Sequence, residues 1–349
     1  MNIMAEQPHK TPLLGMNPEQ LRNVATSLGL PAFQGGQIAQ WIYQKRATSF
    51  DQMNNLSKFA RQKLHENYTI GVEEPIKASE SIDGTIKYLF DAGNGFAVEA
   101  VYIPDDERAT LCISSQKGCR MGCTFCMTGR QGFHGNLSVA QIINQIFSIP
   151  YSQSLTNIVF MGMGEPMDNL SEVSKAIEVL TAKWGLAWSP KRITVSSIGK
   201  LAELNTLIKT SSVHIAISVH SPYHNERLQF MPVEKAYNIE TIMQNLRNYD
   251  FAHQRRLSVE YIMWDGFNDD NVHADALAEL IKGTSARVNL IRFHSIPGFP
   301  YHSSSDNRMI AFRDRLNSKG IICTIRKSRG EDIMAACGML AGANKKHSY

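Results

Sequence analysis

The sequence predicts an α/β fold, built as a partial (β/α) barrel with an N-terminal helical module and a β-hairpin. Two observations carry this prediction. Short apolar runs alternate with helix-like stretches from about residue 108 onwards, and two strand-like runs before that point flank a tight-turn segment. Strands that alternate with helices form βα units with a parallel sheet. With 349 residues, of which 43% are hydrophobic, the chain can bury a core of that size.

The N-terminal part of the chain, residues 17 to about 70, has the pattern of a set of helices. Asn17 suits a helix N-cap, and Pro18 suits the first helical turn. Residues 57–68 form a further helix-like stretch. We interpret residues 1–75 as an N-terminal helical accessory module, and nothing in it suggests chemistry.

A β-hairpin and linker are predicted over residues 76–106. The runs Thr85–Asp91 and Phe96–Ile103 have the composition of strands, and they flank residues 92–95. The sequence of that segment, Ala-Gly-Asn-Gly, favours a tight turn.

Residues 107–343 contain the alternating pattern of the barrel, and residues 344–349 are predicted to form a polar tail. The candidate strands are Thr110–Ser114, Asn157–Met161, Arg192–Ser196, Val213–Ser218, Leu257–Met263, Arg287–Phe293 and Ile321–Ile325. The helix-like stretches between them include Val139–Phe147, Leu170–Lys183, Ile239–Tyr249, Ala274–Ile281 and Met309–Ser318. Seven strands suit a complete or partial barrel, although a doubly wound open sheet shows the same alternation.

Composition narrows the class of protein. Lys and Arg total 36 and Asp and Glu total 32, so the net charge of +4 permits a phosphate-rich partner without requiring one. The sequence has no apolar run of the ~18 residues that a membrane span needs, and its N-terminus lacks the pattern of a secretory signal. These features predict a cytoplasmic protein that makes no membrane contact.

Four of the six cysteines lie close together, from Cys112 to Cys126. In a chain without a secretion signal, metal binding or thiol chemistry is a better interpretation than a disulfide framework. Cys119, Cys123 and Cys126 have the spacing C-x3-C-x2-C directly after the first barrel strand. Two alternatives stay open, namely a zinc site that includes His134 and a redox pair formed by Cys123 and Cys126.

Three cysteine ligands suit a [4Fe–4S] cluster that leaves one iron atom open. An open metal position is where a substrate binds and reacts, as in catalytic zinc sites. The natural occupant is S-adenosylmethionine (SAM), and electron transfer from the reduced cluster would split it to a 5′-deoxyadenosyl radical. The cysteine spacing, with Phe125 before the last cysteine, resembles the signature of radical SAM enzymes. That resemblance implies a barrel of the radical SAM type.

Polar residues follow or end several predicted strands, where barrels place their binding sites. Gly164 lets the backbone approach a ligand closely, and Glu165 can pair with an ammonium group such as that of SAM. A single polar residue at such a position more often caps a helix or forms a hydrogen bond within the core. The repetition of such residues at the ends of several strands favours a cofactor site. The candidate SAM-binding residues are Gly164, Glu165, Ser196, Ser218, Val219, His220 and Asn289.

Two cysteines outside the loop are candidates for thiol chemistry. Cys337 has small neighbours that give access, and the basic stretch Arg326–Gly330 lies just upstream, so its pKa is expected to be lowered. Cys112 lies on the first barrel strand, seven residues before the loop. Cys323 lies in an apolar run and is interpreted as core packing.

The chain resembles the RlmN/Cfr family of radical SAM RNA methyltransferases in six segments that occur in the same order. They are Cys112–Gln116, Cys119–Cys126, Met161–Pro166, Asn289–Ile291, Arg326–Gly330 and Asp332–Leu340. The resemblance extends over most of the chain, including the N-terminal module and the hairpin. It implies one [4Fe–4S] cluster on Cys119, Cys123 and Cys126, and two SAM molecules per turnover.

The resemblance also implies a mechanism. One SAM methylates Cys337, and the radical from a second SAM takes a hydrogen atom from that methyl group. The thiomethylene radical adds to an adenine carbon, Glu99 removes the adenine proton, and Cys112 attacks the sulfur of Cys337 to release methylated RNA. The adenine must be unstacked, which favours an RNA loop, and residues 326–329 and the N-terminal module are expected phosphate contacts.

Two branches of the family differ in the carbon that they methylate. The housekeeping branch methylates C2 of adenine in 23S ribosomal RNA and some transfer RNAs, and the antibiotic-resistance branch methylates C8. Arg326–Gly330 and Pro297–Tyr301 resemble the C2 branch, whereas Ser221–Tyr223 and Arg292 resemble the C8 branch. The prevalence of the housekeeping branch favours C2, with C8 as the alternative.

Two other function classes fit the residues. One is a radical SAM enzyme that acts on a protein or small molecule, and the other is a non-catalytic, zinc-containing RNA-binding protein. The family resemblance implies an external electron donor such as flavodoxin or ferredoxin, and the protein is expected to be a monomer.

Overall fold

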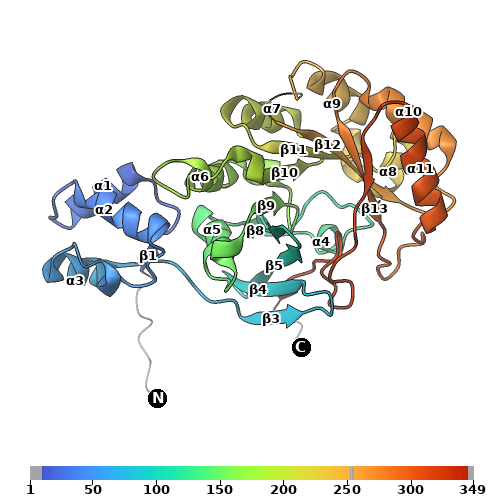
Figure 1. The fold of residues 1–349 in the computed structure, drawn as a ribbon. Helices are drawn as coiled ribbons and strands as arrows, with labels where there is room; N and C mark the ends of the chain where they lie inside the picture. The colour runs from blue at the N-terminus through green and yellow to red at the C-terminus, as the bar shows by residue number, and fades with distance from the viewer. Residues whose placement is uncertain (1–9, 252, 254, 345–349) are drawn as a thin grey trace. The chain divides into compact units, whose positions relative to one another are not determined.

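The computed structural model describes residues 10–251, 253 and 255–344. They form two compact units, each described here by itself (Figure 1). The first unit contains the described residues up to 74, with 138–152 and 174–188, and the second contains 75–137, 153–173 and the described residues from 189 onwards. Among the described residues, no helix is long and apolar enough to cross a membrane.

The boundaries predicted at 75, 106 and 343 stay predictions. The predicted tail 344–349 lies outside the described residues, apart from Asn344.

The first unit is mainly helical. Asn17 caps the first helix, because its side chain accepts a hydrogen bond from Gln20 N at 2.9 Å, and Pro18 occupies the first turn. Two short strands, β1 and β2, pair in parallel. The elements are β1 (Thr11–Pro12), α1 (Pro18–Ser27), α2 (Gln34–Ala39), the π-helical turn η1 (Gln40–Gln44), η2 (Phe50–Gln52), α3 (Lys58–Asn67), β2 (Tyr68–Thr69) and α5 (Val139–Phe147).

The second unit contains the predicted barrel sheet. Seven strands pair in parallel and in chain order, without the reversal that a doubly wound sheet has. All seven candidate strands are therefore confirmed, with ends that differ by a few residues. They are β6 (Arg108–Cys112), β9 (Asn157–Phe160), β10 (Ile193–Ser197), β11 (His214–Ser218), β12 (Leu257–Met263), β13 (Arg287–Arg292) and β14 (Cys323–Ile325).

Helices follow most of these strands, and Figure 1 shows α7, α9, α10 and α11 on the outer side of the sheet. The helix α6 (Leu170–Thr181) begins in this unit, and its residues from 174 onwards group with the first unit. The remaining helices are α7 (Leu201–Thr210), α8 (His224–Phe230), α9 (Ile239–Leu246), α10 (Asn271–Ile281) and α11 (Asp306–Ser318), with the short 3₁₀ helices η3 (Ser152–Ser154), η4 (Pro166–Asn169), η5 (Pro190–Arg192) and η6 (Pro232–Lys235).

The predicted hairpin is also confirmed, and it extends the sheet. The strands β4 (Ile86–Gly93) and β5 (Phe96–Asp105) pair antiparallel, and β5 pairs antiparallel with β6. The sequence pattern missed β3 (Lys77–Glu80), which pairs with β4, because its mostly exposed residues show no apolar alternation. The short strand β15 (Ala343–Asn344) pairs with β5.

A buried asparagine joins the carboxyl ends of β11 and β12. The Asn268 side chain donates hydrogen bonds to the carbonyls of His220 at 2.6 Å and Ile262 at 2.8 Å. It also accepts a hydrogen bond from Trp264 N at 2.7 Å. These bonds position His220, whose φ of 60° lies in the left-handed region, at the end of its strand.

Replacement of this asparagine should destabilise the fold. Asn268→Ala leaves three buried backbone groups without partners, so we expect the free energy of unfolding to fall by roughly 2–4 kcal/mol in denaturant titrations. Asn307→Ala, at an exposed position of α11, is the matched control and should change it by less than about 0.5 kcal/mol. Equal effects would show that the Asn268 contacts contribute little.

Candidate functional site

The three-cysteine loop lies between two short strands. β7 (Gln116–Gly118) precedes the loop, and β8 (Phe133–Asn136) follows the short helix α4 (Met127–Arg130). Cys119 N donates a hydrogen bond to Gly132 O at 2.8 Å, and Thr124 N donates one to Phe230 O at 2.9 Å. Gly118 makes the turn into the loop, since a Cβ there would lie 1.9 Å from the Gly132 carbonyl oxygen.

Cys119, Cys123 and Cys126 line one cavity of about 160 Å³ at the carboxyl ends of the parallel strands. Burial raises the pKa of Cys119 to about 12 and also raises the pKa of Cys123 and Cys126. Repulsion between neighbouring thiolates adds to this effect at Cys119 and Cys123. Holding all three as thiolates therefore requires positive charge within the cavity.

These thiols fit a multi-iron cluster. Among the described residues, no three His, Cys, Asp or Glu side chains converge closely enough to hold a single ion. A cubane instead binds each thiolate to a different iron atom, so it needs sulfur atoms spread around a void. Cys119, Cys123 and Cys126 line one cavity and would hold such a cluster.

His134, the additional ligand of the zinc alternative, has other partners. Its ring stacks on Phe96 with the ring centroids 4.4 Å apart, and its Nε2 lies 3.0 Å from Gln131 O. His134 is not among the residues that line the cysteine cavity.

Five of the seven candidate SAM-binding residues line the same cavity: Gly164, Glu165, Ser196, Ser218 and His220. They lie at the carboxyl ends of β9, β10 and β11. The other two are not lining residues. Val219 is fully buried, and the Asn289 side chain on β13 donates to Glu260 at 2.8 Å and accepts from Thr324 at 3.0 Å.

Glu165 connects the ends of two strands. Its carboxylate accepts hydrogen bonds from Met167 N at 3.1 Å and Ile198 N at 3.0 Å. Burial raises the pKa of Glu165 to about 7, although these hydrogen bonds oppose the shift. Gly164, at a φ of 99°, is required by packing, because a Cβ there would lie 2.5 Å from the Gln116 side chain.

The C-terminal segment brings Cys337 to the cavity that the loop cysteines line. The Arg326 guanidinium donates a hydrogen bond to the Cys337 thiol and pairs with Glu260 at 3.3 Å. Cys112, at the end of β6, lies close enough to Cys337 for their charged forms to repel each other. The structure therefore places both candidate thiols beside one arginine.

The expected lowering of the Cys337 pKa is wrong in its net direction. Burial raises this pKa, and Arg326 opposes the rise only in part. Cys337 as a residue is exposed, but protein atoms surround its thiol in the cavity wall. Burial and the neighbouring Cys337 likewise raise the pKa of Cys112 to about 12. Cys323 is buried on β14, as the apolar run predicted.

Glu99, on β5, is buried and does not lie on an exposed strand face. Its carboxylate lies 3.0 Å from Lys87 Nζ and accepts hydrogen bonds from Ala341 N at 2.8 Å and Gly342 N at 3.1 Å. Glu99 therefore anchors the chain just after Cys337.

Buried charges near the cavity were missed by sequence reasoning. Arg227 is fully buried, pairs with Glu234 at 2.6 Å and donates a hydrogen bond to Ser218 O at 3.0 Å at the end of β11. Glu260 is buried in the middle of β12 and lines the cavity. The one available signal was a charged residue within the apolar run 257–263.

Comparison with known families identifies two matching family models. The Ribosomal RNA large subunit methyltransferase N-terminal domain matches residues 11–70, and the Radical SAM superfamily matches residues 113–277.

Curated relatives match over nearly the full length. The chain is 53% identical over 339 residues to the probable dual-specificity RNA methyltransferase RlmN of Bacteroides thetaiotaomicron, with 97% of this chain and 98% of that protein covered. It is 54% identical over 334 residues to the protein of the same name from Parabacteroides distasonis, with 96% and 97% covered.

A solved structure has the same fold. The crystal structure of a radical SAM methyltransferase from Sphaerobacter thermophilus superposes with a TM-score of 0.89 at 33% sequence identity, covering 95% of this chain and 99% of that chain.

Glu165 should make folding stability depend on pH. Because burial raises its pKa from 4.5 to about 7 in the folded chain, the stability that it contributes is fully present below about pH 4.5. It is lost as the pH rises through about 7, by roughly 3 kcal/mol at ~1.4 kcal/mol per pH unit. Urea denaturation of the cluster-free chain at a series of pH values measures this loss.

Glu165→Gln removes the titrating group, so the difference in unfolding free energy between variant and parent should change across this pH range. Glu279→Gln, at an exposed ion pair with Lys282, is the matched control and should show no such change. A pH-independent difference for Glu165→Gln would contradict the assignment.

Proposed function

Because the chain belongs to the RlmN family of radical SAM RNA methyltransferases, we propose that it methylates C2 of an adenosine in 23S ribosomal RNA and in some transfer RNAs. The family implies one [4Fe–4S] cluster and SAM. The relatives are named dual-specificity RNA methyltransferases, which supports two classes of RNA substrate. The observation that carries the proposal is the placement of Cys337 in the cavity of the loop cysteines and near Cys112.

Cys337 is the proposed methyl carrier. When bound, the cluster and SAM supply a carbon-centred radical that can remove a hydrogen atom from an unactivated methyl group. Cys337 lines the same cavity as Cys119, Cys123 and Cys126, so a methyl group on its sulfur would face that chemistry. The Arg326 N–H donor favours the thiolate form of Cys337, which is the form that accepts a methyl group by displacement.

Cys112 is the proposed resolving thiol. After the methylene carbon has bonded to adenine and the aromatic ring has been restored, the Cys112 thiolate attacks the sulfur of Cys337. A disulfide forms as the bond from that sulfur to the methylene carbon breaks. The electron pair stays on the carbon, which takes up a proton and leaves as the methyl group of the released RNA. Burial and Cys337 raise the pKa of Cys112, while Arg326 opposes both effects. The same arginine therefore assists both thiols.

Glu99 is the proposed base for the adenine proton. Its carboxylate is held by Lys87 and by the amides of Ala341 and Gly342, close in the chain to Cys337. This placement fixes the carboxylate relative to the methyl-carrying segment, which a positioned base needs.

The surroundings of Arg292 are compatible with methylation of C2. Arg292 is one of the residues that resemble the C8 branch, but its guanidinium pairs with Asp306 and is not part of the cavity wall. An arginine that is engaged there does not select the reacting carbon through direct contact, so its presence is compatible with C2 methylation.

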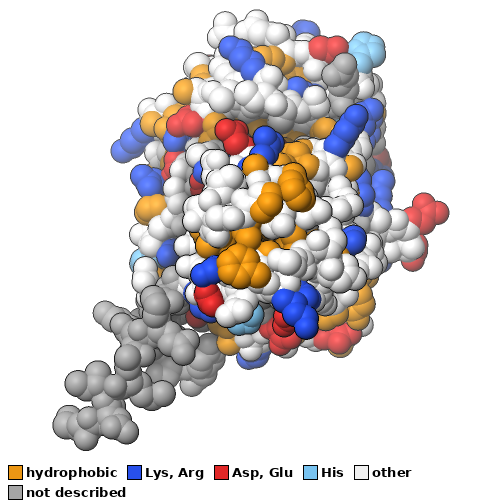
Figure 2. Space-filling view, turned by 90° about the vertical axis from the view of Figure 1, so that its left-hand side faces the viewer, with side chains coloured by type: hydrophobic (Ala, Val, Ile, Leu, Met, Phe, Trp, Pro, Cys, Tyr) orange, Lys and Arg blue, Asp and Glu red, His pale blue; other side chains and the backbone are white. Residues whose placement is uncertain are grey.

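The helical unit offers a surface for RNA. Phe33 and Phe59 are 66% and 58% exposed, and Lys45 lies over the Trp41 ring at 3.8 Å. Figure 2, which faces the side that bears α1–α3 in Figure 1, shows hydrophobic side chains gathered among Lys and Arg. Aromatic rings beside cations suit unpaired bases and phosphates.

The electron donor, flavodoxin or ferredoxin, the monomeric state and the cytoplasmic location stay predictions.

Mass spectrometry of RNA tests the proposed reaction. RNA from cells that contain the protein should hold 2-methyladenosine, which should be absent when the gene is deleted. Cys337→Ala should abolish the product, because no methyl carrier exists, and Cys112→Ala should leave RNA linked to the protein.

Detection of 8-methyladenosine in place of 2-methyladenosine would show that the enzyme methylates C8 of adenine and not C2. Turnover that survives both cysteine substitutions would indicate a radical SAM enzyme with a different substrate.

The Glu99→Gln variant tests whether Glu99 removes the adenine proton or only holds the C-terminal segment in place. Loss of proton removal should lower RNA methylation by about 10²–10⁴-fold, while methylation of Cys337, followed by intact-protein mass spectrometry, continues. Lys77→Gln, on the exposed strand β3, is the control and should leave both steps unchanged. If Glu99→Gln also stops methylation of Cys337, the carboxylate acts only by anchoring the C-terminal segment.

A further inference from the structure

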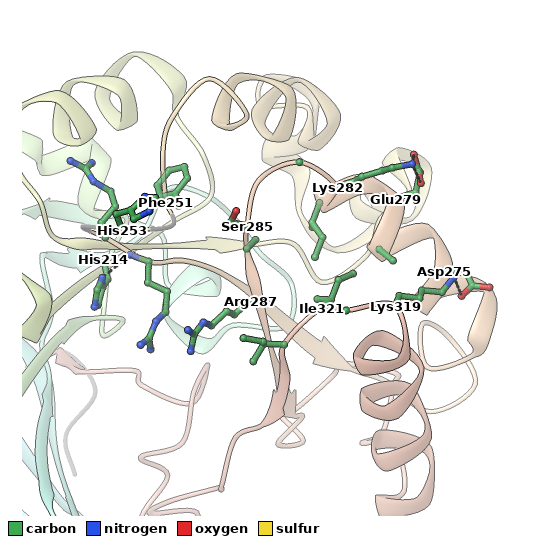
Figure 3. Close-up of a pocket in the computed structure, with 18 of the residues that line it drawn as sticks. His214, Phe251, His253, Asp275, Glu279, Lys282, Ser285, Arg287, Lys319 and Ile321 are labelled. Atoms are coloured by element: carbon green, nitrogen blue, oxygen red, sulfur yellow. Dashed lines mark hydrogen bonds and ion pairs between the residues drawn. The ribbon is translucent and has the colours of Figure 1, made fainter.

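A second cavity, of about 970 Å³, lies at the other end of the parallel strands from the cysteine loop (Figure 3). Its wall includes residues that precede or begin successive strands. These are Lys191 before β10, His214 at the start of β11, Arg256 before β12 and Arg287 at the start of β13. The proposed methyl transfer uses none of them.

The cations at these strand starts lie near one another. Arg256 and Arg287 lie on neighbouring strands, since Ser258 pairs with Arg287 in the register of β12 and β13. Arg108, at the start of β6, is four strand steps from β12, or about 19 Å along the sheet at ~4.8 Å per strand. It nevertheless contributes, with burial and Arg287, to lowering the pKa of Arg256. Arg108 therefore also lies near enough to Arg256 for their charges to repel each other.

The acidic residues of the cavity are already neutralised. Asp275 pairs with Arg315 at 2.7 Å and with Lys319 at 3.1 Å, and Glu279 pairs with Lys282 at 3.1 Å. Figure 3 shows Lys319 and Asp275 together at one side of the cavity, away from His214. Asp275 and Glu279 therefore do not neutralise the cations near the strand starts.

Several of these cationic groups have no acidic partner among the described residues. Lys191, Arg256 and Arg287 form no ion pair with any residue that the structure describes, and the buried Nη1 of Arg255 has no hydrogen-bond partner there. His214 is neutral near pH 7, because burial and the cations around it lower its pKa to about 4. Its Nδ1 accepts a hydrogen bond from Arg256 N at 2.9 Å, so Nε2 carries the proton and can donate to an anion.

We propose that this cavity binds a ligand that carries two or more phosphate groups. Arginine side chains match phosphate oxygens with paired donors, and a chain of phosphates supplies the several negative charges that the cavity lacks. The volume lies at the upper end of the ~300–1,000 Å³ range of small-molecule sites. A free oligophosphate and a phosphodiester segment of RNA share this chemistry. The site is independent of methyl transfer.

Calorimetric titration of the full-length, cluster-containing protein with inorganic tripolyphosphate at about 0.15 M salt tests the proposal. The double variant Arg256→Gln/Arg287→Gln should weaken binding at least about tenfold. Lys77→Gln/Lys235→Gln removes the same charge from exposed positions outside this cavity and should change the affinity by less than about twofold. Lys191→Gln repeats the test if the double variant folds poorly.

Binding of a 23S RNA fragment at several salt concentrations identifies the source of the phosphates. If RNA supplies them, the slope of log K against log salt should fall by about two in Arg256→Gln/Arg287→Gln. If a free oligophosphate supplies them, only tripolyphosphate binding is lost. Equal losses in cavity and control variants would overturn the proposal. So would absence of tripolyphosphate binding by the parent protein together with unchanged RNA binding in the cavity variant.

Discussion

The site depends on the electrostatic cost of placing three thiolates together where protein excludes most water. Burial raises the pKa of Cys119, Cys123 and Cys126, so as free thiols they stay protonated at neutral pH. An iron–sulfur cluster reverses this balance, because its iron atoms supply the positive charge that the thiolates need. Aromatic side chains around Trp264 pack against the loop cysteines and keep the surroundings apolar, which strengthens every charge interaction within the cavity.

Buried polar groups hold the walls of the cavity in place. The buried pair of Arg227 and Glu234 fixes the end of β11, Asn268 joins β11 to β12, and Glu165 joins the ends of β9 and β10. Each of these groups satisfies backbone atoms that the ends of strands leave without partners. Five candidate residues from different strands can therefore line one cavity, although the chain separates them widely.

Much of the fold could be predicted because buried parallel strands appear as apolar runs in the sequence. The exposed strand β3 and the two-residue strands β1 and β2 carry no such signal. At the site, cysteine spacing predicted the loop and strand ends predicted most of the cavity wall. The partners of Glu99 could not be predicted, since Ala341 and Gly342 lie far along the chain. The pKa of Cys337 was misjudged because burial outweighs Arg326, and burial depends on tertiary packing.

Cleavage of SAM by the protein tests the central claim most directly. Anaerobically reconstituted protein that holds about four iron atoms per chain is predicted to release 5′-deoxyadenosine when it is given SAM and a strong reductant. The Cys123→Ala variant, treated in the same way, should release none. On this account, the three cysteines bind a [4Fe–4S] cluster and leave one iron atom free for SAM. Parent protein that retains its iron and still releases no 5′-deoxyadenosine would contradict it.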